Sequence, residues 1–89
     1  MQKKTITIVN KLGLHARAAA KLVKLASEFK SEIEMTFLGK TINAKSIMGV
    51  MMLAAAKGSD VTFKISGEDE SEALEQITAL VNDRFGEEE

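Results

Sequence analysis

The sequence predicts an α+β fold in which a small β-sheet carries helices on one face. Four short segments alternate apolar and polar residues with a period of two, and the segments around them show helical spacing. The chain has 89 residues, a length at which one hydrophobic core can just offset the conformational entropy lost on folding. We therefore expect one two-layer domain over residues 1–89, in the order strand, helix, hairpin, short helix, strand, helix.

The first strand and the first helix flank a loop that contains Gly13. Ile6 and Ile8 alternate with threonines, which predicts a strand over about residues 3–9. After the loop, apolar residues recur with the i, i+3, i+4, i+7 spacing of an amphipathic helix: Ala19, Leu22, Val23 and Ala26. This helix is expected over about residues 16–28.

A β-hairpin is expected next. Ile33, Met35 and Phe37 alternate with polar residues, and residues 38–40 offer a turn before a short strand at 41–43. Ser46 then precedes an apolar run over 47–56 that stops at Lys57 and Gly58, as in a helix with an N-cap serine and a glycine stop.

The last strand and the last helix complete the predicted fold. Apolar residues alternate with polar ones at Val61, Phe63 and Ile65, and Gly67 ends that strand. Asp69 with Glu72 three residues later resembles a capping box for a helix running to about Phe85. The apolar face of this helix consists of Leu74, Ile77 and Val81. The terminal glutamates, 87–89, are interpreted as a solvated, frayed end.

The composition excludes several classes of function. Twelve basic and 13 acidic residues give a net charge of -1, which lacks the electrostatic footprint of a nucleic-acid binder. There is no cysteine and only one histidine, so we expect no metal site and no cofactor. No apolar run reaches the roughly 18 residues of a membrane span, and no secretory signal precedes the first strand. The expected location is the cytoplasm.

The chemically informative residues lie where the Gly13 loop meets the first helix. His15 stands at the helix start, where backbone amides without intrahelical acceptors and the helix dipole stabilise an anion. Neutral imidazole is a nucleophile that can accept a phosphoryl group and release it again. Arg17 can turn its guanidinium back toward the same point and bind phosphate oxygens. These residues together predict a phosphoryl carrier.

Simpler interpretations of these residues stay open. Taken singly, His15 is a helix cap and Arg17 a solvent-facing helix residue. An enzyme acting alone would need a general acid or base beside its nucleophile, and no second histidine, cysteine or tyrosine exists to provide one. Carboxylates could serve, but none adjoins His15 in sequence. A passive binding module is the remaining class.

The helix expected after Ser46 is apolar nearly all round. A short helix on a two-layer domain buries only one side, so part of this set is expected to face a partner. Flexible thioether side chains suit a surface that repacks against several proteins. Val50 and Leu53 are expected in the core, whereas the predicted docking residues are Ile47, Met48, Met51 and Met52. Ser46 is explained by its N-cap role, and a phosphate there would place negative charge beside this patch.

Two segments resemble signatures of the histidine-containing phosphocarrier (HPr) family of the bacterial phosphoenolpyruvate-dependent phosphotransferase system. Residues 13–17, G-L-H-A-R, resemble the family's active-site signature, and residues 45–51, K-S-I-M-G-V-M, resemble its regulatory-serine segment. The resemblance extends over essentially the whole chain. It implies phosphorylation of His15 through Nδ1, assistance by Arg17, and a regulatory phosphoserine at Ser46 where the organism has an HPr kinase.

The resemblance also implies a particular fold and particular partners. The implied fold is an open-faced β-sandwich of four strands in the order 1-4-2-3 with three helices on one face. Enzyme I would donate phosphate derived from phosphoenolpyruvate, and enzyme IIA domains would accept it, in sugar uptake or a regulatory relay. The alternative is a regulatory interaction module controlled by phosphorylation at Ser46, with an HPr kinase/phosphorylase as a further implied partner. We expect a monomer that is a co-substrate and not an enzyme.

Ala18 departs from the proline found at this position in many members of the family. Because alanine favours helix, the phosphate chemistry is expected to survive this difference.

Overall fold

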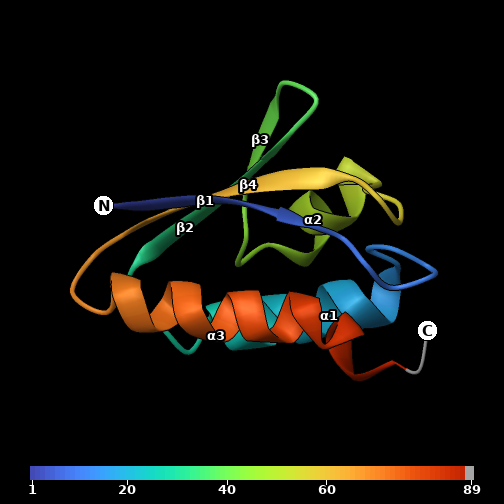
Figure 1. The fold of residues 1–89 in the computed structure, drawn as a ribbon. Helices are drawn as coiled ribbons and strands as arrows, with labels where there is room; N and C mark the ends of the chain where they lie inside the picture. The colour runs from blue at the N-terminus through green and yellow to red at the C-terminus, as the bar shows by residue number, and fades with distance from the viewer. Residues whose placement is uncertain (88–89) are drawn as a thin grey trace.

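The computed structural model describes residues 1–87, and its elements follow the predicted order (Figure 1). A short 3₁₀ turn, η1, follows the last helix. The bounds are β1 Gln2–Thr7, α1 Ala16–Ala26, β2 Glu32–Phe37, β3 Lys40–Asn43, α2 Ile47–Leu53, β4 Asp60–Ser66, α3 Glu70–Asn82 and η1 Arg84–Gly86.

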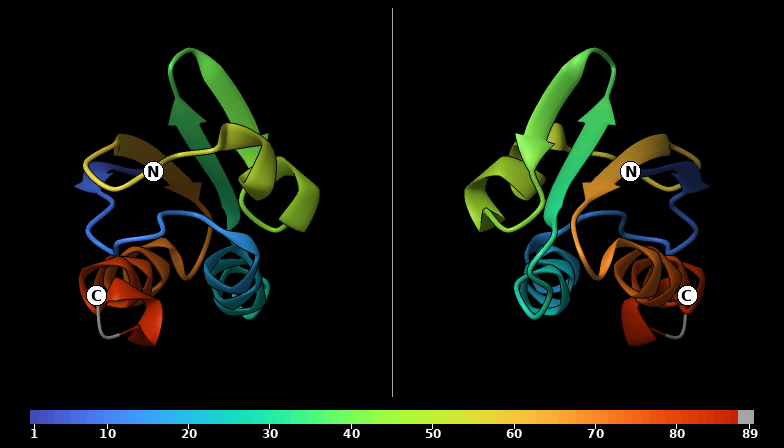
Figure 2. Two further views of the ribbon diagram at one scale, coloured as in Figure 1. Left: turned by 90° about the vertical axis from the view of Figure 1, so that its right-hand side faces the viewer. Right: turned by 90° about the vertical axis from the view of Figure 1, so that its left-hand side faces the viewer.

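The four strands form one antiparallel sheet in the order β1-β4-β2-β3. Long α1 and α3 lie side by side beneath the sheet, and short α2 packs against α1 and β3 at the sheet end (Figures 1 and 2). The opposite face is open and carries threonine pairs that join neighbouring strands, Thr5 with Thr62 and Thr36 with Thr41. The structure thus confirms the α+β class, the strand order and the open-faced sandwich.

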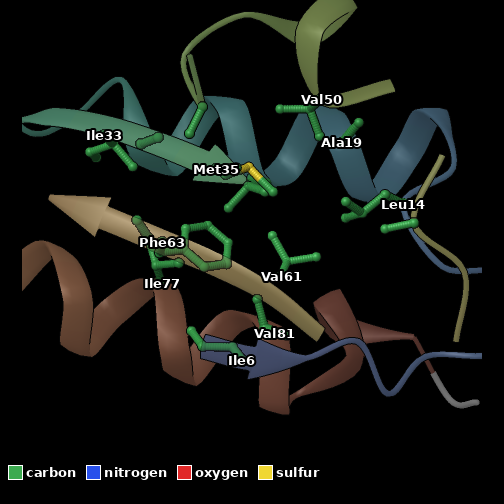
Figure 3. Packing of buried hydrophobic residues seen from close by; sticks show 14 of the residues in the cluster. Ile6, Leu14, Ala19, Ile33, Met35, Val50, Val61, Phe63, Ile77 and Val81 are labelled. Atoms are coloured by element: carbon green, nitrogen blue, oxygen red, sulfur yellow. The ribbon is translucent and has the colours of Figure 1, made fainter. Parts of the chain in front are cut away.

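The core lies between the sheet and the helices (Figure 3). Every second residue of β4 points into it, so Val61, Phe63 and Ile65 are fully buried, as the alternation predicted. The helices contribute Leu22 from α1 and Ile77 from α3, both fully buried. Burial of these side chains therefore holds α1 and α3 against the sheet.

Four predicted element ends were wrong by two or three residues. The last helix, α3, stops at Asn82 and not at about Phe85, because the chain turns at Arg84 and Phe85, which have positive φ angles. At Ile8, which was expected to continue the first strand, the backbone N–H donates to the carbonyl of Ser59 outside the sheet ladder. The helix α1 stops at Ala26, two residues before the predicted end. The helix α2 stops at Leu53, because Ala54 adopts a left-handed conformation with φ 51° that ends the helix before Gly58.

The predicted capping box at the start of α3 is also wrong. Asp69 occupies the N-cap position, but its side chain makes no capping bond to its own helix. Its carboxylate instead accepts hydrogen bonds from the backbone N–H groups of Lys30 and Ser31 and from the Ser31 hydroxyl, at 2.9, 3.0 and 2.5 Å. Ser31 is buried, so Asp69 ties the start of α3 to the segment that leads into β2.

This carboxylate makes stability depend on pH. The Ser31 hydroxyl, followed by the Lys30 amide, holds the pKa of Asp69 below its usual value. Because the folded pKa is depressed, the stabilisation is complete above the ordinary aspartate pKa of about 4 and is lost as pH falls through the folded pKa. Asp69→Asn is therefore expected to lower the melting temperature by several degrees at pH 7 and to flatten its fall at acidic pH.

Thermal unfolding followed by circular dichroism between about pH 2 and pH 7 checks this expectation. Asp83→Asn is the matched control, since Asp83 is an exposed aspartate just beyond the other end of the same helix. Identical pH profiles for the wild-type protein and Asp69→Asn would show that the Asp69 cluster does not carry acid sensitivity.

Candidate functional site

His15 is the N-cap residue of α1, as the sequence predicted for the helix start. Its backbone is extended, with φ -72° and ψ 176°, and its ring Nδ1 accepts a hydrogen bond from the backbone N–H of Arg17 at 3.3 Å. About a quarter of the side chain, 26%, is exposed. The ring thus satisfies one unpaired amide of the first helical turn while it stays accessible to solvent.

The loop before α1 is fixed by contacts at Gly13 and its neighbours. The Leu14 N–H donates to the Ala55 carbonyl at 2.9 Å, and Gly13 has a positive φ of 65°. Asn10 is fully buried, and its Nδ2 donates to the Gly13 carbonyl at 2.8 Å. The loop is therefore held both by the segment after α2 and by its own asparagine, which sets the position of His15.

Glu87 is a site residue that sequence reasoning missed. Its Oε2 lies 2.5 Å from Nε2 of His15, and its Oε1 accepts a hydrogen bond from Nδ2 of Asn10 at 2.8 Å. The hydrogen bond from Asn10, and then that with His15, holds the pKa of the Glu87 carboxyl below its usual value, although partial burial opposes the shift. The interpretation of this residue as part of a frayed end is wrong, and residues 88 and 89 lie outside the described residues.

A tight turn after α3 brings Glu87 to the site. Arg84, Phe85 and Gly86 have consecutive positive φ angles of 55°, 54° and 78°, which reverse the chain. Phe85 is fully buried, and its carbonyl accepts a hydrogen bond from Nζ of Lys21 on α1 at 2.6 Å. Figure 1 shows the chain returning to the end of the molecule where α1 begins. An apolar residue and a glycine just after a helix were the available sequence signal for this turn.

The hydrogen-bond partners define the state of the His15 ring. Nδ1 accepts a hydrogen bond from the Arg17 N–H, so it is unprotonated and holds a lone pair, and Nε2 faces a carboxylate, so it carries the ring proton. The Arg17 side chain is exposed, and no hydrogen bond or ion pair of its guanidinium is seen within residues 1–87. The arrangement therefore offers a nucleophilic nitrogen at a solvent-facing helix start, two residues before an exposed arginine.

The exposed face of α2 divides as the sequence predicted. Val50 and Leu53 are buried in the core. The remaining apolar side chains are 41 to 69% exposed and form what we term the α2 surface: Ile47, Met48, Met51 and Met52. α2 packs against α1, and Ala55, just after α2, accepts a hydrogen bond from Leu14 in the loop before α1, so α2 lies near the start of α1.

Ser46 is the N-cap of α2, as predicted. Its backbone is extended, and its Oγ accepts a hydrogen bond from the Gly49 N–H at 3.2 Å. The residue is partly exposed and directly precedes the α2 surface. Its hydroxyl therefore has a structural role, and a phosphate at this position would lie beside Ile47 and Met48.

Residues 1–87 contain no group of three or more histidine, aspartate or glutamate side chains arranged to hold a metal ion. No helix in that range has the length and apolar character needed to cross a membrane.

The fold and the site together define a small α+β protein that presents one histidine at a helix start beside an exposed apolar helix. Residues 2–83 match the family described as "PTS HPr component phosphorylation site". The chain belongs to the HPr family of phosphocarrier proteins of the phosphotransferase system.

Relatives and solved structures agree with this assignment over the full length. The phosphocarrier protein HPr of Cupriavidus necator is 55% identical over 87 residues, which is 98% of each chain. HPr-C-His from Thermoanaerobacter tengcongensis is 46% identical, with a TM-score of 0.96 over 100% of both chains. An HPr dimer from the same organism also matches, at 46% identity and a TM-score of 0.79 over 98% of this chain and 100% of that one. A monomeric state thus stays a prediction.

Proposed function

We propose that the protein accepts a phosphoryl group on Nδ1 of His15 from enzyme I and passes it to enzyme IIA domains. The observation that carries the proposal is the state of that nitrogen, which holds a lone pair at the solvent-facing start of α1. Membership of the phosphocarrier family supports it. The protein would act in the cytoplasm as a co-substrate of the two partners, without a turnover of its own.

The proposed transfer chemistry uses the hydrogen bonds at the start of α1. The Nδ1 lone pair attacks the phosphorus, the bond between phosphorus and the donor breaks, and the donor recovers that electron pair. The Arg17 N–H, which now donates to Nδ1, is then positioned to donate to a phosphate oxygen. The exposed guanidinium of Arg17 supplies a second, charge-assisted contact. In the second step an acceptor nucleophile attacks the same phosphorus, and the electron pair returns to Nδ1.

The direct test is incubation with enzyme I, magnesium and phosphoenolpyruvate. The expected product is a mass increment of one phosphate that is lost in acid, with a phosphorus NMR signal of a phosphoramidate. Omission of enzyme I is the control. A protein that gains no phosphate, or that gains an acid-stable one, would contradict the carrier function and leave a binding module as the better description.

The α2 surface is proposed to dock both enzyme I and the acceptor domains. Met48→Asp places a charge within this surface and is expected to raise the apparent KM for enzyme I about tenfold, as for removal of a moderately important interface residue. The fold should be unchanged, since Met48 is 69% exposed. Steady-state phosphorylation rates at varied protein concentration measure the effect.

Leu38→Asp is the matched control for this docking prediction. Leu38 is 84% exposed and lies in the turn between β2 and β3. An equal rise in KM for both variants would show that the α2 surface has no special part in docking.

Ser46 supports a second function, that of a regulatory phosphorylation site. Its partly exposed hydroxyl precedes the α2 surface, so a phosphate there would place about two negative charges beside Met48. Incubation with an HPr kinase and ATP should yield an acid-stable phosphate that Ser46→Ala lacks, and the modified protein should accept phosphate on His15 more slowly. If Ser46 is not modified, or if its modification leaves the rate of His15 phosphorylation unaltered, a regulatory role for Ser46 is contradicted.

A further inference from the structure

We propose that Glu87 is a positioning residue for phosphoryl transfer, which orients the His15 ring and stabilises the positive charge that the ring gains when Nδ1 is phosphorylated. This inference rests on the proposed carrier function. It assigns a role to a carboxylate that lies 72 residues from the histidine in sequence and in contact with it in space.

The contact between Glu87 and His15 gives the two ring nitrogens different protonation states. Glu87 accepts the Nε2 proton, and this fixes Nδ1 as the nitrogen that keeps a lone pair. The two hydrogen bonds lie at the two nitrogens, so together they also set the rotation of the ring. Because Glu87 contacts the ring at Nε2, it does not block the approach of a phosphoryl group to Nδ1.

The charge balance of the transfer step explains why a carboxylate is useful there. When Nδ1 forms its bond to phosphorus and the donor takes back its electron pair, Nε2 still holds its proton. The His15 ring therefore gains positive charge, shared between the two nitrogens. A carboxylate at 2.5 Å from Nε2 stabilises this charge more than it stabilises the neutral ring, and such differential stabilisation lowers the barrier.

Glu87 is itself held in place by a built support. Its second carboxylate oxygen is bound by Asn10, a fully buried residue that also holds the Gly13 carbonyl of the His15 loop. The turn before Glu87 is anchored by buried Phe85 and by the hydrogen bond from Lys21. A carboxylate with this many fixed neighbours is preorganised, which distinguishes it from a chance contact of a mobile end.

Kinetics of phosphorylation by enzyme I test the inference. At saturating concentration, Glu87→Ala is expected to lower kcat roughly tenfold with little change in KM, the loss typical of one hydrogen bond to a charged group at a partly exposed site. Glu87→Gln keeps an acceptor without the charge, so its kcat should fall between those of the wild-type protein and Glu87→Ala. Glu75→Ala, which removes an exposed glutamate from α3, is the matched control and should be unaffected.

Nitrogen NMR of the histidine ring supplies a readout that does not depend on phosphate. In the wild-type protein the Nε2 proton should be visible and slow to exchange with solvent, because Glu87 holds it. In Glu87→Ala this proton signal should disappear through exchange, while the rest of the spectrum stays folded. Glu75→Ala should keep the signal.

The outcomes separate the two proposals. If the wild-type protein takes up no phosphate, the carrier function fails, and the role of Glu87 fails with it. If the wild-type protein is phosphorylated and Glu87→Ala matches its kcat, only the role of Glu87 is overturned. A faster Glu87→Ala would also overturn it, since the contact would then restrain the histidine.

Discussion

A His15→Gln variant is expected to acquire no acid-labile phosphate from enzyme I and phosphoenolpyruvate, a complete loss of transfer. His15 is the only histidine of the chain, so no second imidazole can replace it as the acceptor. An amide nitrogen has no available lone pair, because that pair is delocalised into the carbonyl. Mass spectrometry of the intact protein before and after acid treatment measures the result.

Glutamine is chosen because it preserves the start of α1. Its side-chain oxygen can accept the Arg17 N–H that Nδ1 of His15 accepts in the structure. The circular dichroism spectrum and the melting temperature should therefore stay close to those of the wild-type protein. A phosphate of normal acid lability on folded His15→Gln would place the acceptor elsewhere and contradict the proposed site.

Arg17→Ala separates the covalent acceptor from the charge beside it. Arg17 is exposed, and its guanidinium supports no fold contact within residues 1–87, so stability should change little. Transfer should continue but slow about ten- to a hundredfold, as expected for one charge-assisted contact to phosphate. Stopped-flow rates of phosphorylation measure the effect, and an unchanged rate would remove Arg17 from the site.

The fold was predictable because its elements obey local rules that tertiary packing did not override. The alternation at Val61, Phe63 and Ile65 placed a strand, and the structure buries all three. Element order alone left the strand order open. The 1-4-2-3 order came from the family resemblance, because pairing of β1 with β4 joins segments more than 50 residues apart.

The element ends were less predictable because they depend on tertiary contacts. Asp69 and Glu72 have the spacing of a capping box, yet the Asp69 carboxylate binds Ser31 and Lys30, which follow α1 in the sequence. A local pattern cannot show that a distant hydroxyl and amide compete for the same carboxylate. The same holds for the end of α2, where Ala54 adopts a conformation that alanine seldom favours.

The part of the site that is contiguous in sequence was predictable, whereas the residue that folding brings to it from the other end of the chain was not. His15, Arg17 and Gly13 lie within five residues, and their chemistry follows from a helix start. Glu87 belongs to an acidic terminal run, which by composition indicates a solvated end. The turn from Arg84 to Gly86 and the burial of Phe85 bring Glu87 back to His15. The phenylalanine and glycine after the helix indicate a turn, but they do not show where the turn directs the chain.

Gly13→Ala is expected to lower the free energy of unfolding by about 2 to 4 kcal/mol and to slow transfer. A Cβ at this position would lie 2.5 Å from the Ala55 carbonyl oxygen and 2.8 Å from the Ala56 Cα, both backbone atoms that cannot rotate away. Relief requires the two segments to separate, and the Leu14 hydrogen bond to Ala55 is then weakened. The left-handed φ of 65° adds a cost of about 1 to 2 kcal/mol for any residue with a side chain.

Gly39→Ala isolates the part of this cost that comes from the close approach. Gly39 also has a positive φ, 80°, but a Cβ there would meet no atom within 4 Å. Urea unfolding should therefore show a loss of only about 1 kcal/mol for Gly39→Ala and unchanged phosphorylation. Since Gly13 and its packing partners hold the loop that carries His15, Gly13→Ala should lose both stability and transfer rate. Equal losses in the two variants would mean that the segment around Ala55 yields to the added methyl group, and that its packing does not position the histidine.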